Sequence, residues 1–296
     1  MRMTVCTAVR DVLGASCGAA SLERCIRSVA ALPFEHEHLV YDGASADGTA
    51  DFVRALAREI PTLKVVSEPD SGIYDALDKG VRDASGKWFY VLGADDWVLD
   101  SSFLKSCLDR ADQEDDDLFI TPVEYGESPV WPAERHDICD LLEGMPYSHQ
   151  GALVRTDLIR ELGGYDRGYR IAADYKFHLQ AHLRGAKTGC AWRVFAHVGA
   201  SGLSGTHNRI LKDEGGRVRC EVFGLSPAAA ERHLRTGTLA PAKWLGLLSS
   251  PEPFTRRVGR LLARRWFWHK HKDGTFSTRY LMGVPVFRHR LKRRAF

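Results

Sequence analysis

Two adjacent carboxylates, Asp95 and Asp96, follow an apolar run at residues 88–92. Like charges at this range disfavour ionisation, and a divalent cation beside them removes that cost. Mg²⁺ and Mn²⁺ prefer oxygen ligands and are commonly held by one or two carboxylates together with substrate phosphates. A solvated turn, or a cap for the next helix, uses the same residue types. The pair alone therefore predicts either a metal site or a polar turn.

Two further segments rich in Asp, Ser and Gly, 41–49 and 67–80, each follow an apolar run. The first contains Asp42, whose carboxylate could accept a hydrogen bond from a nucleotide base or a ribose hydroxyl. The second contains Asp70 and Ser71, which are candidate caps for a helix. Taken singly, both segments are equally typical of turns closed by Asp, Ser and Thr side chains.

Alternating strand and helix patterns determine where these segments lie. Apolar, β-branched runs predict strands, and apolar residues at helical spacing predict helices. The predicted strands are 3–9, 38–41, 63–66 and 88–92, and the predicted helices are 21–32, 49–60 and 73–84. This order implies an α/β fold with a doubly wound, mostly parallel sheet. Ligands of such sheets bind beyond the carboxyl ends of the strands, so we expect the three acidic segments to converge on one edge.

Together the three segments resemble a known family. DGxSxDGT, then SExDxGIYDA, then a strand ending in GADD is similar to the nucleotide-binding half of family 2 inverting glycosyltransferases with the GT-A fold. Asp42, Asp70 and Asp95 are separated by 28 and 25 residues, as that pattern requires. The resemblance is closest to bacterial enzymes of exopolysaccharide, colanic-acid or O-antigen assembly, and it covers residues 3–205.

The resemblance implies donor-binding residues. Asp42 would recognise the nucleotide base, and Thr7 and Val9 would lie in the strand-end segment that lines that base. Asp70 would lie near the nucleotide, and Asp95 near the ribose. These residues would bind a nucleoside-diphosphate-sugar.

The resemblance also implies a divalent cation, Mn²⁺ or Mg²⁺, held by Asp96. His197 could approach the metal or a phosphate, although a single histidine is more often structural. Asp11 and Asp78 stand where the family often has Asn, and Asp78 could be only a helix residue.

The acceptor side is implied by the segments 147–151 and 163–175. His149 and Gln150 would lie on the acceptor side, where His149 could contact the acceptor or the donor, and Asp174 would be the catalytic base. Inverting transfer needs such a group, because the acceptor hydroxyl loses its proton as it attacks the anomeric carbon. Asp166, in a Gly-Tyr-Asp loop, is the rival candidate.

The length of 296 residues suggests one large domain, or one domain with an appendage. We predict a catalytic domain at 1–207, with a nucleotide-binding half at 1–100 and an acceptor half at 101–207, and a basic, mainly helical extension at 208–296. Proline-rich residues 124–146 predict a long loop.

The end of the chain is strongly cationic. Residues 254–296 hold 13 Lys and Arg against one acid, whereas the rest of the chain holds 28 against 37 Asp and Glu. Residues 254–272 predict a basic amphipathic helix, and 280–287 could form a hairpin. Such a segment either lies on an anionic membrane surface or packs on the main domain. A nucleic-acid partner is not expected, because no recognised motif accompanies the charge.

Seven cysteines without any C-x-x-C pair argue against a disulfide framework and a zinc site. The sequence lacks a secretory signal pattern and an apolar run long enough to span a membrane. We therefore expect a cytoplasmic enzyme, peripheral on the cytoplasmic face of the inner membrane if the basic end binds lipid.

Three other functions would each have their own sequence or mutational signature. A nucleotidyltransferase-like enzyme would need a glycine-rich basic loop after the first strand, and residues 8–11 are a poor match. A dinucleotide-binding enzyme would show G-x-G-x-x-G at the same place. A non-catalytic nucleotide-sugar or polysaccharide binder stays open, and it predicts that Asp174 is dispensable.

Overall fold

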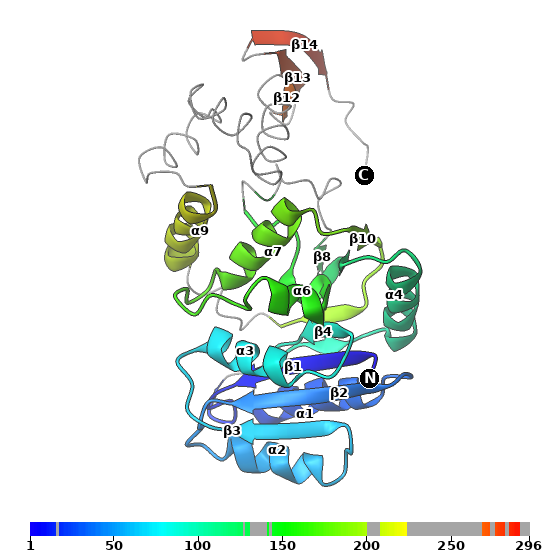
Figure 1. The fold of residues 1–296 in the computed structure, drawn as a ribbon, viewed down its shortest axis with the longest axis vertical. Coiled ribbons are helices and arrows are strands. Elements are labelled where there is room, and N and C mark those ends of the chain that lie inside the picture. The colour runs from blue at the N-terminus through cyan, green and yellow to red at the C-terminus, as the bar shows by residue number, and fades with distance from the viewer. Residues whose placement is uncertain are drawn as a thin grey trace.

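The computed structural model describes the chain at residues 1–15, 18–126, 128–130, 141, 144–199, 208–223, 268–272, 276–281 and 284–290. Its centre is a seven-stranded sheet in the order β10-β6-β9-β4-β1-β2-β3 (Figure 1). The strands are β1 (Met3–Val9), β2 (His36–Asp42), β3 (Leu63–Ser67), β4 (Trp88–Val91), β6 (Leu118–Ile120), β9 (Ala152–Arg155) and β10 (Thr188–Cys190). Only β9 runs antiparallel to its neighbours, β4 and β6, within this sheet. The predicted mostly parallel α/β sheet is confirmed.

Helices cover both faces of the sheet (Figure 1). They are α1 (Gly18–Ala30), α2 (Thr49–Ala57), α3 (Ile73–Asp83), α4 (Ser101–Gln113), α6 (Thr156–Glu161), α7 (Ala173–Arg184) and α9 (Asn208–Phe223). Apolar residues of α1, α2 and α4 pack on one face, and those of α3, α6 and α7 pack on the other. Along β1 the side chains alternate between these two cores: Val5 packs with α1 and α4, and Cys6 packs with α3. None of the described helices has both the length and the apolar character needed to cross a bilayer.

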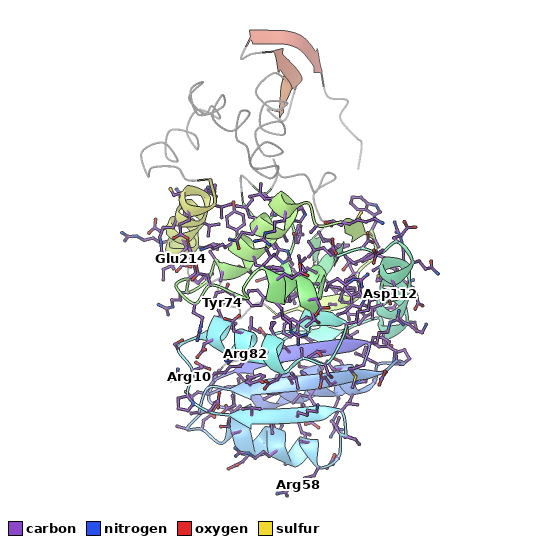
Figure 2. All side chains as sticks on the ribbon, in the orientation of Figure 1. Arg10, Arg58, Tyr74, Arg82, Asp112 and Glu214 are labelled. Atoms are coloured by element: carbon purple, nitrogen blue, oxygen red, sulfur yellow. The ribbon has the colours of Figure 1, made fainter. Side chains whose placement is uncertain are left out.

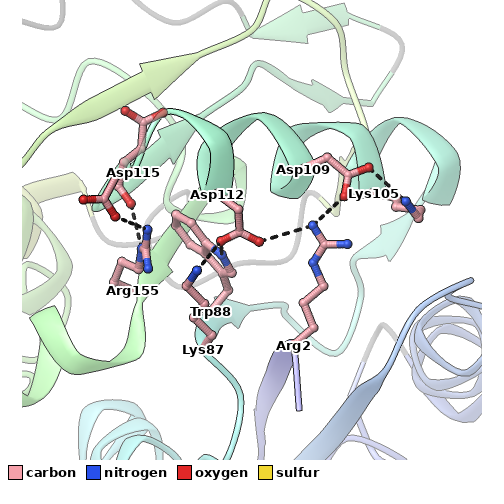
Figure 3. A network of polar contacts seen from close by, with 9 residues as sticks. Arg2, Lys87, Trp88, Lys105, Asp109, Asp112, Asp115 and Arg155 are labelled. Atoms are coloured by element: carbon pink, nitrogen blue, oxygen red, sulfur yellow. Dashed lines mark hydrogen bonds and ion pairs between the residues drawn. The ribbon is translucent and has the colours of Figure 1, made fainter.

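A charged network fastens α4 to the end of the sheet where β1 and β4 begin (Figure 3). Arg2 bonds Asp109 at 2.7 Å and Asp112 at 3.3 Å, and Lys87 bonds Asp112 at 2.7 Å. The indole N–H of Trp88 also donates to Asp112, at 3.0 Å. The network stabilises the amino ends of these strands and leaves their carboxyl ends to the acidic segments.

A second sheet corrects the predicted loop at 124–146. Its order is β5-β11-β7-β8, formed by β5 (Trp97–Val98), β7 (Val123–Tyr125), β8 (Ser128–Val130) and β11 (Ala196–Val198). Pro129 had favoured a loop, but β8 is the edge strand, and edge strands tolerate proline because their outward-facing N–H groups make no ladder bond. Most of residues 127–143 lies outside the described residues.

The described part of the C-terminal extension contains α9 and an antiparallel sheet, β12 (Trp268–Lys272), β13 (Phe276–Leu281) and β14 (Val284–Arg290). The predicted hairpin within 280–287 is confirmed by the pairing of β13 with β14. The predicted helix at 254–272 is wrong at its end, because 268–272 is a strand that pairs with β13 along its whole length. Residues 254–267 lie outside the described residues.

Candidate active site

The predicted acidic segments meet at the carboxyl ends of the central strands. Asp42 ends β2 and lies in register with Val9 of β1 and with Ser67 of β3. The carboxylate of Asp42 is buried, and it accepts hydrogen bonds from the Ser67 hydroxyl at 2.6 Å and from the hydroxyl and backbone N–H of Ser45. Asp70 lies against Gly43, since a Cβ atom built on that glycine would be 2.5 Å from an Asp70 oxygen. Asp42 and Asp70 are thus brought together, as the sequence predicted.

The loop after β1 is fastened to the loop after β2. Asp11 accepts a hydrogen bond from the Ala46 N–H at 2.8 Å, and Asp47 accepts one from the Gly14 N–H at 2.8 Å. Asp11 has a φ of 48°, in the left-handed region that Asp and Asn tolerate better than other side chains. That backbone demand explains how Asp can replace the usual Asn here. Asp11 therefore shapes the loop beside Asp42.

Thr7 and Val9 lie at the expected strand but turn their side chains into the core. The Thr7 hydroxyl is fully buried and hydrogen bonds Nε2 of His38 at 2.9 Å. Val9 is 4% exposed and packs with the apolar residues of α1 and α2. Any contact of these two residues with a nucleotide base would therefore be made by backbone atoms. Their role in binding stays a prediction.

Asp96 is the more buried member of the acidic pair, with 1% exposure. Its two oxygens accept backbone N–H bonds from Gly93 and Gly199, each at 2.8 Å. Burial raises the pKa of Asp96 to about 6, the charge of Asp95 adds to this, and hydrogen bonds from Gly199, Gly93 and Gln150 oppose it. A nearby positive charge would favour the ionised form of this carboxyl group.

Gly199, at the end of β11, also lies against Asp95. A Cβ atom built on Gly199 would lie 2.2 Å from an Asp95 oxygen and 2.8 Å from its Cβ atom. His197, two residues earlier, instead stacks its ring on Trp97 with a centroid distance of 3.7 Å and bonds Glu124 through Nδ1 at 3.2 Å. The described contacts therefore place the glycine, and not the histidine, at the acidic pair.

Few protein side chains would coordinate a metal ion here. Among the described residues, no group of three or more His, Cys, Asp or Glu side chains is arranged to hold one. Asp95 and Asp96 can supply one or two carboxylates, and magnesium-type sites in phosphate-transfer enzymes complete their coordination with substrate phosphates and water. The donor set thus fits a cation that binds together with a diphosphate.

The predicted base, Asp174, lies in the first turn of α7 and is half-buried. It accepts a hydrogen bond from the Tyr74 hydroxyl at 3.1 Å and from the Tyr175 N–H at 2.7 Å. Tyr74 belongs to α3, the helix that follows Asp70, so one element links the nucleotide segment to the base. Asp166, the rival, is paired with Lys176 at 2.5 Å, and this ion pair favours a structural role.

His149 begins a short 3-10 helix, η1 (His149–Gly151), and bonds another histidine. Its Nδ1 lies 3.2 Å from Nε2 of His178, whose Nδ1 lies 3.1 Å from the Tyr147 hydroxyl. Burial lowers the pKa of His149, and the charge of Asp174 opposes that effect. His178 was not singled out from the sequence, although it lies one turn after Asp174 on α7.

Gln150 connects the two halves of the site. Its Oε1 accepts a hydrogen bond from the Ser148 hydroxyl at 2.7 Å, and its side chain is close enough to Asp96 to lower the pKa of that carboxyl group. Its backbone carbonyl accepts the Tyr90 hydroxyl of β4 at 3.0 Å. The acceptor-side segment thus reaches the acidic pair.

Asp78 has a structural role, which the sequence left open. Its carboxylate accepts the Tyr165 N–H at 2.7 Å and lies so close to Gly164 that a Cβ atom there would be 2.5 Å away. Arg167 bonds Asp75 at 2.9 Å and lies 3.8 Å from Asp78. These contacts hold the loop between α6 and α7 against α3.

Comparison with known proteins agrees with this arrangement. Residues 15–177, more than half of the chain, match the glycosyl transferase family 2, and the chain belongs to that family. The match spans Asp42, Asp70, the acidic pair at 95–96 and Asp174.

Curated relatives cover the same region. The PGL/p-HBAD biosynthesis glycosyltransferase of Mycobacterium tuberculosis is 29% identical over 165 residues, which make up 55% of this chain and 64% of that protein. The uncharacterized glycosyltransferase YwdF of Bacillus subtilis is 27% identical over 154 residues, covering 49% of this chain and 58% of that protein. The chain therefore spans less than two thirds of the length of these relatives.

Solved structures share the fold. TarS of S. aureus in complex with UDP-GlcNAc matches with a TM-score of 0.60 and 14% identity, over 95% of this chain and 97% of that chain. The mannosyltransferase PcManGT of Pyrobaculum calidifontis, in complex with GDP-Man and Mn²⁺, matches with a TM-score of 0.60 and 18% identity, over 89% and 80%. At these identities the likeness establishes the GT-A fold.

Proposed function

We propose that this protein is an inverting glycosyltransferase that moves a sugar from a nucleoside-diphosphate-sugar to an acceptor hydroxyl. The observation that carries the proposal is the link through Tyr74: α3 begins directly after the Asp70 segment, and its Tyr74 hydroxyl bonds Asp174 at 3.1 Å. Family 2 membership supports the class of reaction. The nucleotidyltransferase alternative has no comparable support.

The donor would bind at the edge where β1, β2 and β4 end. Asp42 keeps unused acceptor capacity after its bonds to Ser45 and Ser67, since an ionised carboxylate has about four lone-pair sites. A base N–H or a ribose hydroxyl would take one of them. Asp95, half-buried beside Gly199, would lie near the ribose.

A Mn²⁺ or Mg²⁺ held by Asp96 would neutralise the charge that grows on the departing nucleoside diphosphate. Two neighbours of the same fold hold a nucleotide-sugar, and one of them also holds Mn²⁺. The backbone bonds from Gly93 and Gly199 fix the Asp96 carboxylate before any ligand arrives. Such preorganisation is the usual source of electrostatic catalysis.

Asp174 would take the proton from the acceptor hydroxyl as that oxygen attacks the anomeric carbon. The bond to the diphosphate breaks in the same displacement, so the configuration inverts and no sugar becomes attached to the enzyme. A base in this position typically contributes about 10²–10⁴-fold to the rate. His149 and Gln150, on the segment that reaches Asp96, would contact the acceptor.

We further propose a lipid-linked saccharide as acceptor, in the assembly of a cell-surface polysaccharide on the cytoplasmic face of the inner membrane. The support is the cationic end of the chain, residues 254–296, with 13 Lys and Arg against one acid. Clustered basic residues are attracted to anionic lipid by about 1 kcal/mol each near the surface. Flotation with anionic vesicles, with and without residues 254–296, tests this point, and equal flotation of both proteins would refute it.

The donor is tested by thermal shift with UDP-, GDP- and dTDP-sugars in the presence of Mn²⁺. A ligand that binds the folded state raises the apparent stability by mass action, so the cognate donor should give the largest shift. Sugar transfer by wild type and by Asp174→Asn then separates an enzyme from a binder. If Asp174→Asn binds the donor and transfers sugar at the wild-type rate, Asp174 is not the base.

A further inference from the structure

Glu214, on α9, accepts hydrogen bonds through its carboxylate from the backbone just before Asp174. Figure 2 labels this residue on α9. It is 8% exposed. Its Oε1 accepts the Arg170 N–H at 2.8 Å, and its Oε2 accepts the N–H groups of Ile171 at 2.8 Å and of Ala172 at 3.0 Å. Hydrogen bonds to an ionised acceptor are roughly twice as strong as neutral ones. Three of them on consecutive residues fix the path of this turn.

The turn at 170–172 leads directly into α7. The N-cap residue is Ala172, whose side chain cannot accept a hydrogen bond from the helix start. In a capping box, a Glu of the same helix reaches back to the N-cap N–H. Here Glu214 makes that bond from another helix, so α9 sets how α7 begins.

Tyr74 holds the same turn through other atoms. Its hydroxyl shares its one proton between the carbonyl oxygen of Ile171 and the carboxylate of Asp174, which lies 3.1 Å away. Ile171 therefore has its N–H bound by Glu214 and its C=O bound by the Tyr74 hydroxyl. Asp174 lies two residues after the last amide that Glu214 binds.

We infer that Glu214 is a positioning residue for the base: it fixes the turn that places the Asp174 carboxylate for proton transfer. The inference rests on the proposed role of Asp174. Residues 208–223, which form α9, lie beyond the 15–177 that match the family, so the family match does not assign this role. Displacing a catalytic group by about 1 Å can lower a rate by about 10²-fold.

The test compares three variants on α9. Glu214→Ala removes all three bonds, whereas Glu214→Gln keeps one oxygen acceptor and places an NH₂ group against at least one backbone N–H. Glu221→Ala is the matched control, because Glu221 is an outer carboxylate of the same helix that pairs with Lys176 at 2.6 Å. Activity is followed as nucleoside diphosphate release from the UDP-, GDP- or dTDP-sugar with the largest thermal shift, with octyl glycosides as acceptors.

A positioning role predicts a split between rate and binding. Glu214→Ala should lower kcat by about 10- to 100-fold, while its donor KM and its thermal shift with nucleoside diphosphate stay at the wild-type values. Glu214→Gln should be intermediate, and Glu221→Ala should resemble wild type. If Glu214→Ala does not fold, the kcat and donor KM of Glu214→Gln alone test the inference. A wild-type kcat in the folded Glu214 variants, or an equal loss of donor affinity and kcat, overturns the inference.

Asp174→Asn separates this inference from the proposed function. If Asp174→Asn keeps wild-type kcat, the base assignment fails, and the Glu214 inference fails with it. If Asp174→Asn is inactive and Glu214→Ala is fully active, only the Glu214 inference fails. Because Glu214 is inferred to act through Asp174, the double variant should be no slower than Asp174→Asn alone. A kcat of the double variant below that of Asp174→Asn would contradict the inference that Glu214 acts through Asp174.

Discussion

Replacing Gly199 by alanine should damage the acidic pair without straining the backbone. Gly199 does not have the positive φ that makes alanine costly, so the main-chain conformation accepts a Cβ atom. That atom would lie 2.2 Å from an oxygen of Asp95, 2.5 Å from its Cγ and 2.8 Å from its Cβ. Turning the end of the Asp95 side chain cannot relieve a contact with its Cβ atom. The residue, or the strand end that carries Gly199, must move.

The size of the movement follows from these distances. Ordinary contact begins at 3.4 Å, so the 2.2 Å approach must lengthen by about 1.2 Å. The Gly199 N–H also bonds Asp96 at 2.8 Å, so a movement of Gly199 disturbs Asp96, whereas a movement on the other side displaces Asp95. A misplacement of about 1 Å can cost about 10²-fold in rate. We therefore expect kcat/KM to fall by about 10²-fold, which corresponds to about 2.7 kcal/mol.

The control for this variant is Gly216→Ala. Gly216 lies inside α9, and a Cβ atom there would meet nothing within 4 Å among the described residues, apart from its chain neighbours and the backbone of its own helix. The same chemical change should leave kcat/KM unaltered and stabilise the helix by up to about 1 kcal/mol. Both variants are compared by nucleoside diphosphate release and by thermal shift with Mn²⁺ and nucleoside diphosphate. Wild-type kcat/KM in Gly199→Ala would refute the placement of the acidic pair at the reacting diphosphate.

Three further predictions concern other parts of the molecule. Tyr74→Phe removes the hydroxyl donor to Asp174, and kcat should fall by about 10-fold with an unchanged thermal shift by the donor; an unchanged kcat would contradict the link between α3 and the base. Asp42→Asn weakens a hydrogen-bond acceptor for the nucleotide base, so the Kd for nucleoside diphosphate measured by calorimetry should rise by about 10-fold. An unaltered Kd would show that Asp42 does not bind the nucleotide base. Burial alone raises the pKa of Glu37, but hydrogen bonds from three neighbouring residues outweigh it and hold the pKa at about 2, against 4.5 for a free glutamate. Because the pKa of Glu37 is lower in the folded state than in the unfolded state, its ionised carboxylate stabilises the fold. This contribution to the free energy of unfolding is complete above pH 4.5 and is lost as the pH falls towards 2. At about 1.4 kcal/mol per pH unit, it amounts to about 3 kcal/mol. Urea unfolding of wild type and Glu37→Gln at pH 7 and pH 3 measures it, and a difference between the two proteins that does not shrink at pH 3 would argue against it.

The sequence predicted the first hundred residues well because their structure is locally encoded. Each strand there contains a short apolar run, although β2 also begins with the polar residues His36, Glu37 and His38, and each helix has one apolar face that packs on its neighbouring strands. Asp42 and Asp70 therefore converge where the pattern placed them. Two predictions failed where pairing with the next strand along the chain decides the structure. Residues 123–130 pair as β7 and β8 despite Pro129, and 268–272 pair with β13 despite a helical pattern before them.

Contacts that depend on tertiary packing had no signal in the sequence. Gly199 lies more than a hundred residues after Asp96 and contributes only a backbone N–H and the absence of a side chain. Glu214 lies 40 residues after Asp174, in a segment predicted only as an extension. His178 has one local signal, its place one turn after Asp174, but its partner His149 comes from another element.

Through these contacts a segment outside the family match bonds the region that carries Asp174. α3 carries Tyr74 and Asp78, which bond Asp174 and the loop before α7. α9 carries Glu214, which bonds the turn between that loop and Asp174. The start of α7 is therefore fixed by two helices, one of which follows the donor segment. Because each of them bonds this short region directly, a change on either helix should reach Asp174 without unfolding the sheet.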